Sequence, residues 1–234
     1  MRRAVGLGSL ILLLTSLASG PSWGQSKWKV PEKIKDKAWF VKAPVFPDIH
    51  ETPGLPRVLI IGDSISMQYG PEVRRLLEGK ANVYRIPDNG RTTKFGLSQL
   101  DYWMGDGHWA VIHFNFGLHD LNKNDSHLPI ADYEKNLKQI VKQLQSTGAK
   151  LIWASTTPVP VGIEKRIESD VIAYNTVAKK IMGEHHVPIN DLHARVLSWD
   201  EQGAGWQLDE HFRAEGYTDL AAEVARCILA ALQK

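Results

Sequence analysis

The sequence is poor in cysteine, and this limits how the protein can be stabilised. Cys227 is the single cysteine among 234 residues, so no disulfide can form within one chain. Its apolar neighbours Val224, Ile228 and Leu229 predict a small buried side chain there rather than a reactive thiol. No cysteine near the start of the chain is available for lipid attachment. Stability must come from a hydrophobic core, and the length suffices for one sizeable α/β domain.

The patterns that mark nucleic-acid, metal and nucleotide sites are also lacking. There are 28 Lys plus Arg against 26 Asp plus Glu, and loss of Arg2 and Arg3 with a leader would leave a formally neutral protein. A nucleic-acid-binding domain would show a basic excess. The histidines, including His185, His186 and His193, have no acidic or thiol partners at metal-ligand spacing. No glycine-rich phosphate loop comes after the first apolar run. We therefore expect no nucleic-acid partner, no metal and no nucleotide cofactor.

The first residues have the pattern of a secretory signal peptide. A basic start at Met1-Arg2-Arg3 precedes an apolar run from Leu10 to Leu17 and small residues near Ser22-Trp23-Gly24. The apolar run is too short to span a bilayer, and no later segment is long enough either. We expect cleavage close to Gln25, export to the periplasm or the medium, and no stable membrane insertion afterwards. An uncleaved membrane anchor is the alternative for residues 1–24.

Residues 25–56 differ in composition from the rest of the chain. Six lysines alternate with five prolines, namely Lys27, Lys29, Lys33, Lys35, Lys37 and Lys42 with Pro31, Pro44, Pro47, Pro53 and Pro56. Proline at this frequency prevents regular hydrogen-bonded structure, so we expect an extended arm with a solvated lysine face. Trp28, Trp39 and Phe40 are expected to pin the arm to the body, because large rings gain most from burial. Residues 57–234 then form the domain.

From Arg57 onward, short apolar runs alternate with amphipathic stretches. Strands are expected at 57–62, 81–86, 109–115, 150–155 and 187–190, and helices near 71–79, 95–104, 130–146, 168–184 and 215–232. Pro71 fits the first turn of the first helix. The alternation predicts right-handed crossovers and a five-stranded parallel sheet with helices on both faces. Ligands bind such sheets beyond the carboxyl ends of the strands.

Polar clusters stand at that edge of the predicted sheet. They are Gly62-Asp63-Ser64, Asp88-Asn89-Gly90, Asn115 to Asp120, and Asp209-Glu210-His211. A serine held there by a rigid scaffold suits a nucleophile, and an imidazole that titrates near working pH is the natural base for it. Each cluster alone is also compatible with an ordinary turn. Together they predict Ser64 as nucleophile and His211 as base.

The order of these clusters resembles the SGNH/GDSL hydrolase superfamily over residues 57–232. Gly62-Asp63-Ser64 matches the nucleophile block, Gly90 the glycine block, Gly117 to Asp120 the Gly-x-Asn-Asp block, and His211 the catalytic histidine. The resemblance implies a flavodoxin-like three-layer sandwich with sheet order 2-1-3-4-5. It also implies ester hydrolysis through an acyl-enzyme.

The first departure from that pattern concerns the oxyanion donors. His119 stands where the family usually has asparagine, and a neutral imidazole still carries one N–H. We expect it to donate to the oxyanion together with the backbone N–H groups of Ser64 and Gly90. Asn115 is the alternative side-chain donor. The other interpretation of His119 is a supporting or core residue beside Asp120, a carboxylate expected, like that of Asp63, to hold loop shape.

The second departure concerns the carboxylate that orients His211. The family has Asp three residues before the histidine, and Leu208 occupies that position here. Asp209, two residues before, is the candidate, because a loop one residue shorter still allows the contact. A histidine oriented by a backbone carbonyl is the alternative, in which Asp209 is an ordinary loop acid.

Eight tryptophans bear on the substrate. Trp103, Trp109 and Trp153 fall in predicted elements and are expected in the core, whereas Trp199 and Trp206 precede His211 and are candidates for a cleft wall. Together with export and a neutral surface, they favour an esterase acting on acylated carbohydrate or another small ester. An exported carbohydrate O-acyltransferase and a noncatalytic carbohydrate-binding domain are the alternatives. The sequence makes no prediction of oligomeric state.

Overall fold

The computed structural model describes residues 51–233 except 106–107, 125 and 200–208. The predicted signal peptide at 1–24, the arm up to residue 50 and Trp206 lie outside the described residues. The end of the arm is described: Thr52 and Leu55 are held by the side chain of Asn82, whose amide donates to both carbonyls. Among the helices of the described ranges, none combines the length and apolar character needed to cross a membrane.

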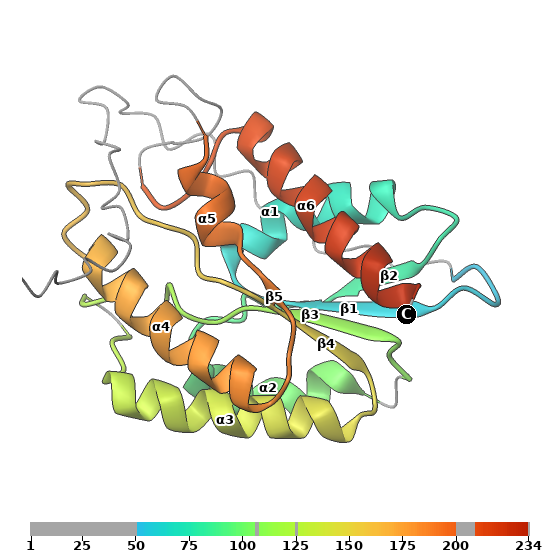
Figure 1. The fold of residues 1–234 in the computed structure, drawn as a ribbon, viewed down its shortest axis with the longest axis horizontal. Coiled ribbons are helices and arrows are strands. Elements are labelled where there is room, and N and C mark those ends of the chain that lie inside the picture. Colours follow the sequence, from blue (N-terminus) through green and yellow to red (C-terminus); the bar gives the residue numbers. More distant parts are fainter. Residues whose placement is uncertain (1–50, 106–107, 125, 200–208, 234) are drawn as a thin grey trace, which may run out of the picture.

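A parallel sheet of five strands forms the middle layer (Figure 1). The strands are β1 (Arg57–Ile61), β2 (Asn82–Arg85), β3 (Val111–Phe114), β4 (Lys150–Ala154) and β5 (Ile189–Asn190). Their order is β2-β1-β3-β4-β5, and every neighbouring pair is parallel. This confirms the predicted sheet order. The carboxyl ends of β1, β2 and β3, which precede the polar clusters, therefore meet at one edge of the sheet.

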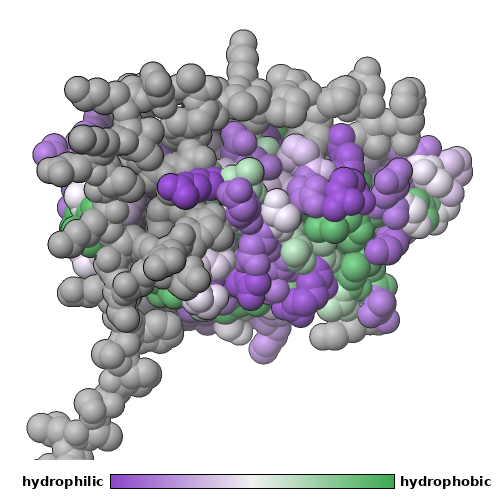
Figure 2. Space-filling model, turned by 90° about the horizontal axis from the view of Figure 1, so that it is seen from above, coloured by the Kyte–Doolittle hydropathy of each residue, from purple (hydrophilic) through white to green (hydrophobic). Residues whose placement is uncertain are grey.

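Helices cover both faces of this sheet. The helices α1 (Ser64–Leu76), α5 (Leu192–Leu197) and α6 (Ala214–Leu232) lie on one face, and α2 (Thr93–Met104), α3 (Ile130–Ser146) and α4 (Glu168–Glu184) lie on the other (Figure 1). The outer surface over α1 and α6 is mainly hydrophilic, with hydrophobic residues showing in smaller areas (Figure 2). The result is the three-layer α/β sandwich that the sequence predicts.

The core is built from apolar residues on both faces of the strands. Val58, Leu59, Ile60 and Ile61 of β1 are all at most 2% exposed, as a central strand covered on both sides requires. The apolar face of α3 is buried against the sheet side, while its lysines face solvent. The predicted core tryptophans Trp103, Trp109 and Trp153 are buried. Cys227, by contrast, is only half-buried, although burial still raises the pKa of its thiol to about 11.

The first helix is the main difference from the sequence prediction. It begins at Ser64, not near Pro71, because the Asp63 carboxylate accepts the N–H of Ile65 at 3.0 Å and caps the helix directly after the strand. Pro71 therefore lies inside the helix, where it removes one backbone hydrogen bond. Burial of Ile65, Tyr69 and other apolar residues offsets that loss. The sequence also does not predict the short helix α5.

The packing of α2 on the loop after β3 gives a test of this fold. An alanine normally stabilises a helix interior relative to glycine, but a Cβ at Gly96 would lie 2.6 Å from the ring of Phe116. We predict that Gly96→Ala lowers the free energy of unfolding by about 1–3 kcal/mol, because the ring has to move. Urea denaturation measures the change.

The control is Gly183 in α4, where a Cβ would meet nothing within 4 Å. Gly183→Ala is expected to raise the free energy of unfolding by about 0.5–1 kcal/mol. Equal stabilisation by both substitutions would show that α2 does not pack on Phe116 in this way.

Candidate active site

Ser64 stands at the junction of β1 and α1, where strand and helix are separated by only two residues. The first four N–H groups of a helix have no partner within it, so the backbone N–H of Ser64 is available to a ligand. Within the described part of the chain, it donates to no protein atom. The positive end of the helix dipole also lies here. The junction therefore offers a hydroxyl and an amide donor side by side.

His211 and Asp209 complete a chain of hydrogen bonds from this serine. The Oγ of Ser64 lies 2.8 Å from Nε2 of His211, and Nδ1 of His211 lies 2.8 Å from Oδ1 of Asp209. The same carboxylate oxygen accepts the backbone N–H of His211 at 3.0 Å. Burial raises the pKa of the Asp209 carboxyl, but the hydrogen bonds and the charge of His211 outweigh this and lower it. The structure thus brings together the three residues predicted as a triad.

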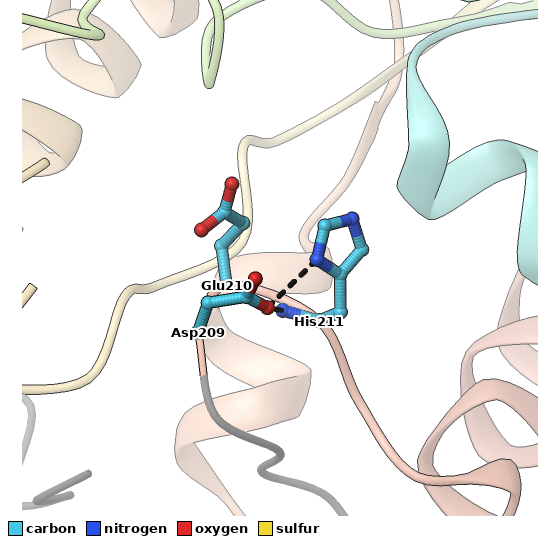
Figure 3. A group of neighbouring side chains, drawn as sticks. All are labelled: Asp209, Glu210 and His211. Atoms are coloured by element: carbon cyan, nitrogen blue, oxygen red, sulfur yellow. Dashed lines mark hydrogen bonds and ion pairs between the residues drawn. The ribbon is translucent and has the colours of Figure 1, made fainter. Parts of the chain in front are cut away.

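A three-residue cluster with potential metal ligands is part of this chain. The ligand atoms of Asp209, Glu210 and His211 lie within 4.8 Å of one another. Figure 3 shows the Asp209 carboxylate turned towards the His211 ring, and the Glu210 carboxylate directed away from that contact. Glu210 forms ion pairs with Arg166 and Lys165 instead. These hydrogen bonds and ion pairs fit a hydrogen-bonded triad better than a metal site.

His119 supplies a ring whose nitrogens are not used by the protein. Within the described residues, its imidazole makes no hydrogen bond, while its backbone carbonyl accepts the Ser126 hydroxyl at 2.8 Å. Burial lowers the pKa of His119, as do the charges of Arg166 and Arg91, whereas Asp63 and Glu210 act in the opposite direction. The net lowering favours the neutral ring, which has one N–H to donate. This state is compatible with the predicted oxyanion role, because one ring N–H remains to donate.

The other two predicted donors are engaged within the protein. The N–H of Gly90 donates to the carbonyl of Gly62 at 2.9 Å. This N–H is therefore already engaged and is not free to donate to an oxyanion in this structure. The side-chain amide of Asn115 donates to the carbonyl of Ala154 at 2.8 Å and is also 3.4 Å from Thr156 Oγ1. Asn115 therefore ties the loop after β3 to β4, and its role as the alternative donor stays a prediction. A Cβ at Gly90 would lie 2.8 Å from the Gly62 carbonyl, which explains the glycine.

Arg85 is a functional candidate that the sequence reasoning missed. This buried guanidinium lies at the end of β2 and uses all five of its N–H donors. Four of the acceptors are backbone carbonyls and one is a hydroxyl, namely Gly62, Asp63, Ile86 and Asp88, and Ser66 Oγ. The Asp63 carbonyl belongs to the same peptide as the N–H of Ser64, so its bond to Arg85 helps to fix the direction of that N–H. An arginine next to buried strand residues was the available signal.

Trp199 supports the histidine loop through its packing. Its ring meets Phe212, the neighbour of His211, edge-on with centroids 5.2 Å apart, and its N–H donates to Asp219 at 2.9 Å. Trp199 therefore packs next to His211, and its expected place in a cleft wall stays a prediction.

Asp120 holds the loop after β3 to the start of α2, as expected of a structural carboxylate. Its Oδ1 accepts the N–H of Thr93 at 2.9 Å and the Thr93 hydroxyl at 2.6 Å, while Oδ2 has no partner in the described residues. Burial raises the pKa of Asp120 to about 7, although the bonds from Thr93 act to lower it.

This shift gives a pH-dependent prediction for stability. Between about pH 4 and 7 the folded state keeps the proton on Asp120 that the unfolded chain releases, so this carboxyl makes stability fall as pH rises. Relative to Asp120→Asn, the wild type is expected to lose on the order of 1–3 kcal/mol across this range. Denaturant titrations at several pH values measure it. Asp101→Asn, at an exposed position, is the control, and a difference between wild type and Asp120→Asn that stays constant with pH would contradict the assignment.

Comparison with solved structures finds the same fold elsewhere. The acetyl xylan esterase AlAXEase superposes with a TM-score of 0.67 at 13% identity, covering 74% of this chain and 99% of that one. A lipase/acylhydrolase from Enterococcus faecalis gives 0.64 at 20% identity, covering 75% and 96%. A catalytic mutant of an acetylxylan esterase from Geobacillus stearothermophilus gives 0.59 at 15% identity, covering 73% and 93%. At these identities the likeness establishes the fold.

The sequence itself decides the family. No curated protein matches the chain. Residues 60–218 match the GDSL-like lipase/acylhydrolase family, a span that runs from β1 into α6 and includes Ser64, His119 and His211. The chain belongs to the GDSL-like lipase/acylhydrolase family and is a carboxylic ester hydrolase.

Proposed function

We propose that the protein is an exported serine esterase that removes acyl groups from acylated carbohydrate, or from another small ester, through an acyl-enzyme. One observation carries this proposal. The hydrogen-bonded chain from Ser64 Oγ to His211 Nε2, and from His211 Nδ1 to Asp209, has both contacts at 2.8 Å. Such a chain supplies a nucleophile, a base and a group that orients the base.

The first half-reaction forms the acyl-enzyme. Ser64 Oγ attacks the ester carbonyl while His211 Nε2 takes its proton, and Asp209 holds Nδ1–H and stabilises the imidazolium. The tetrahedral intermediate collapses when the C–O bond to the alcohol breaks, and His211 returns the proton to the leaving oxygen. In the second half-reaction, water attacks the acyl carbon and gives a proton to His211. The bond between the acyl carbon and Ser64 Oγ then breaks, His211 returns the proton to Oγ, and the acid is released.

Charge on the former carbonyl oxygen needs donors that do not have to reorganise. The N–H of Ser64 at the helix start and the ring N–H of His119 are the two donors that the described residues leave available. Each such donor contributes on the order of 3 kcal/mol to transition-state stabilisation in comparable sites. A neutral His119 keeps one ring N–H to donate, and its lowered pKa is consistent with that state.

Four observations support a carbohydrate ester as substrate. Two of the similar structures are acetyl xylan esterases. The expected mature chain is formally neutral. Of its tryptophans, Trp199 and Trp206 precede His211 in the sequence, and an aromatic face there would suit a sugar ring. The amino-terminal pattern supports export, and polymeric carbohydrate substrates occur outside the cytoplasm. Saccharide esters are thus the first partners to test.

The two alternatives differ in their support. The noncatalytic carbohydrate-binding alternative rests on the displaced aspartate, and the hydrogen bond between Asp209 and His211 argues against it. The O-acyltransferase alternative uses the same serine and histidine. It differs only in the acceptor, since a sugar hydroxyl rather than water would take the acyl group.

The triad is tested with a panel of acetylated xylo-oligosaccharides, short nitrophenyl esters and feruloyl esters. We expect wild type to hydrolyse an acetyl ester without added acceptor, and Ser64→Ala to be inactive. Asp209→Asn is expected to lower kcat by on the order of 10⁴, because the imidazole loses its orienting carboxylate.

Labelling of Ser64 by a fluorophosphonate provides a readout that needs no natural substrate. Absence of both labelling and hydrolysis in the folded wild type would overturn the esterase proposal. Acyl transfer to a sugar with little hydrolysis would favour the transferase. Near-normal kcat in Asp209→Asn would show that the carboxylate does not orient the base.

Export is tested separately by sequencing the amino terminus of protein expressed with its own leader in a bacterial host. Protein outside the cytoplasm is expected to begin close to Gln25, and Leu13→Arg, which interrupts the apolar run, is expected to remain unprocessed. Full-length protein starting at Met1 in the membrane fraction would favour an anchor instead.

A further inference from the structure

Arg166 joins two loops of the candidate site without belonging to either. It lies between β4 and α4, and its side chain is only 4% exposed. Its Nε donates to the carbonyl of Leu118 at 2.6 Å, and its Nη1 pairs with the carboxylate of Glu210. Leu118 precedes His119, and Glu210 lies between Asp209 and His211. One guanidinium therefore connects the loop that carries His119 with the loop that carries His211.

We propose that Arg166, paired with Glu210, is a positioning residue that fixes the position of His119 relative to the triad. This rests on the proposed serine esterase function. Arg166 acts through the Leu118 carbonyl on one side and through Glu210 on the other.

The planar shape of the guanidinium makes this connection specific. Its N–H groups point in fixed directions, so one edge reaches a backbone carbonyl while another reaches a carboxylate. The carbonyl of Leu118 and the N–H of His119 share one rigid peptide plane. The bond to Arg166 therefore fixes the orientation of the peptide group that leads into His119. The Ser126 hydroxyl holds the next carbonyl, that of His119 itself, at 2.8 Å. The backbone on both sides of the His119 side chain is thus anchored.

The buried location makes the pair difficult to replace. The side chain of Glu210 is 6% exposed and is also approached by Lys165 Nζ at 3.2 Å. Removal of Glu210 leaves the buried Arg166 charge without its carboxylate, whereas removal of Arg166 leaves Glu210 paired with Lys165. Single and double substitutions therefore separate the effect of charge from the effect of position.

The charges around His119 give a readout of how close Arg166 and Glu210 lie to its ring. Four charged groups act on its pKa: Asp63 and Glu210 raise it, while Arg166 and Arg91 lower it, in addition to the lowering by burial. Loss of Arg166 alone should raise the pKa of His119, and loss of the Glu210 charge alone should lower it. Loss of both should leave the pKa near its wild-type position.

The experiment compares Arg166→Met, Glu210→Gln and the double variant. The pKa of His119 is measured by NMR titration of its ring protons, assigned with His119→Asn, and kcat and KM are measured on an acetyl ester. We expect the pKa to rise in the first variant, fall in the second and stay near wild type in the third. We expect kcat to fall on the order of tenfold or more in Arg166→Met and in the double variant, with a smaller change in KM, because an oxyanion donor acts mainly in the transition state.

Arg166→Lys keeps the charge but loses the fork, so the pKa of His119 should stay near wild type while kcat falls. This variant also keeps the test decisive if Arg166→Met does not fold. Arg226→Met is the matched control, because it breaks an ion pair with Glu223 within α6, away from the site. The control should leave kcat and the His119 titration unchanged, even where it lowers Tm.

Two results would overturn the positioning role. One is an unchanged kcat in Arg166→Lys and Arg166→Met despite lower Tm. The other is a His119 titration that does not respond to the loss of either charge. A wild type without esterase activity would instead reject the proposed function, and the titration would still report on the pair.

Discussion

The abrupt passage from β1 into α1 fixes the position of Ser64, and the rest of the site is arranged around that point. Only Gly62 and Asp63 separate the buried strand from the helix, and the Asp63 carboxylate caps the helix at once. The hydroxyl of Ser64 thereby meets an imidazole 147 residues later in the chain, while its backbone N–H stays free of the helix. The parallel sheet then brings the remaining loops to the same edge.

Buried polar groups, rather than disulfide bonds, hold these loops together. Arg85 ties the nucleophile loop to the loop of Gly90, Arg166 ties the loop of His119 to that of His211, and Asp120 ties the loop after β3 to α2. Each of these groups is costly to bury alone, and each is compensated by several directed bonds. Directed bonds restrict loop geometry more tightly than apolar contacts of equal area. Such restriction suits a site whose donors must be in place before the reaction.

Much of the fold could be predicted from the sequence because it depends on apolar periodicity. Strands buried on both faces and the long amphipathic helices at 130–146 and 168–184 were placed correctly, and the sheet order came from the family resemblance. The start of α1 was missed because Pro71 suggested a helix start, whereas capping by Asp63 and packing of the residues between them decided it. The six residues of α5 are too few for a periodic pattern.

At the site, the sequence predicted the residues with distinctive chemistry but not the partners of backbone groups. Ser64, His211 and Asp209 come together as expected, and the ring of His119 remains free within the described residues. The donor roles of Gly90 and Asn115 could not be assessed from sequence, because an N–H is available only if no nearby carbonyl takes it. Arg166 gave no signal, since its two partners lie 48 and 44 residues away in the chain.

The shortness of the outermost strands has a consequence for the behaviour of the protein at high concentration. The sheet ends in β2, with four residues, on one side and in β5, with two, on the other. Unpaired backbone groups along a long, flat edge strand can pair with strands of other molecules, and short edge strands offer few such groups. Intermolecular strand addition and fibril growth are thereby disfavoured in a chain that cannot close an internal disulfide.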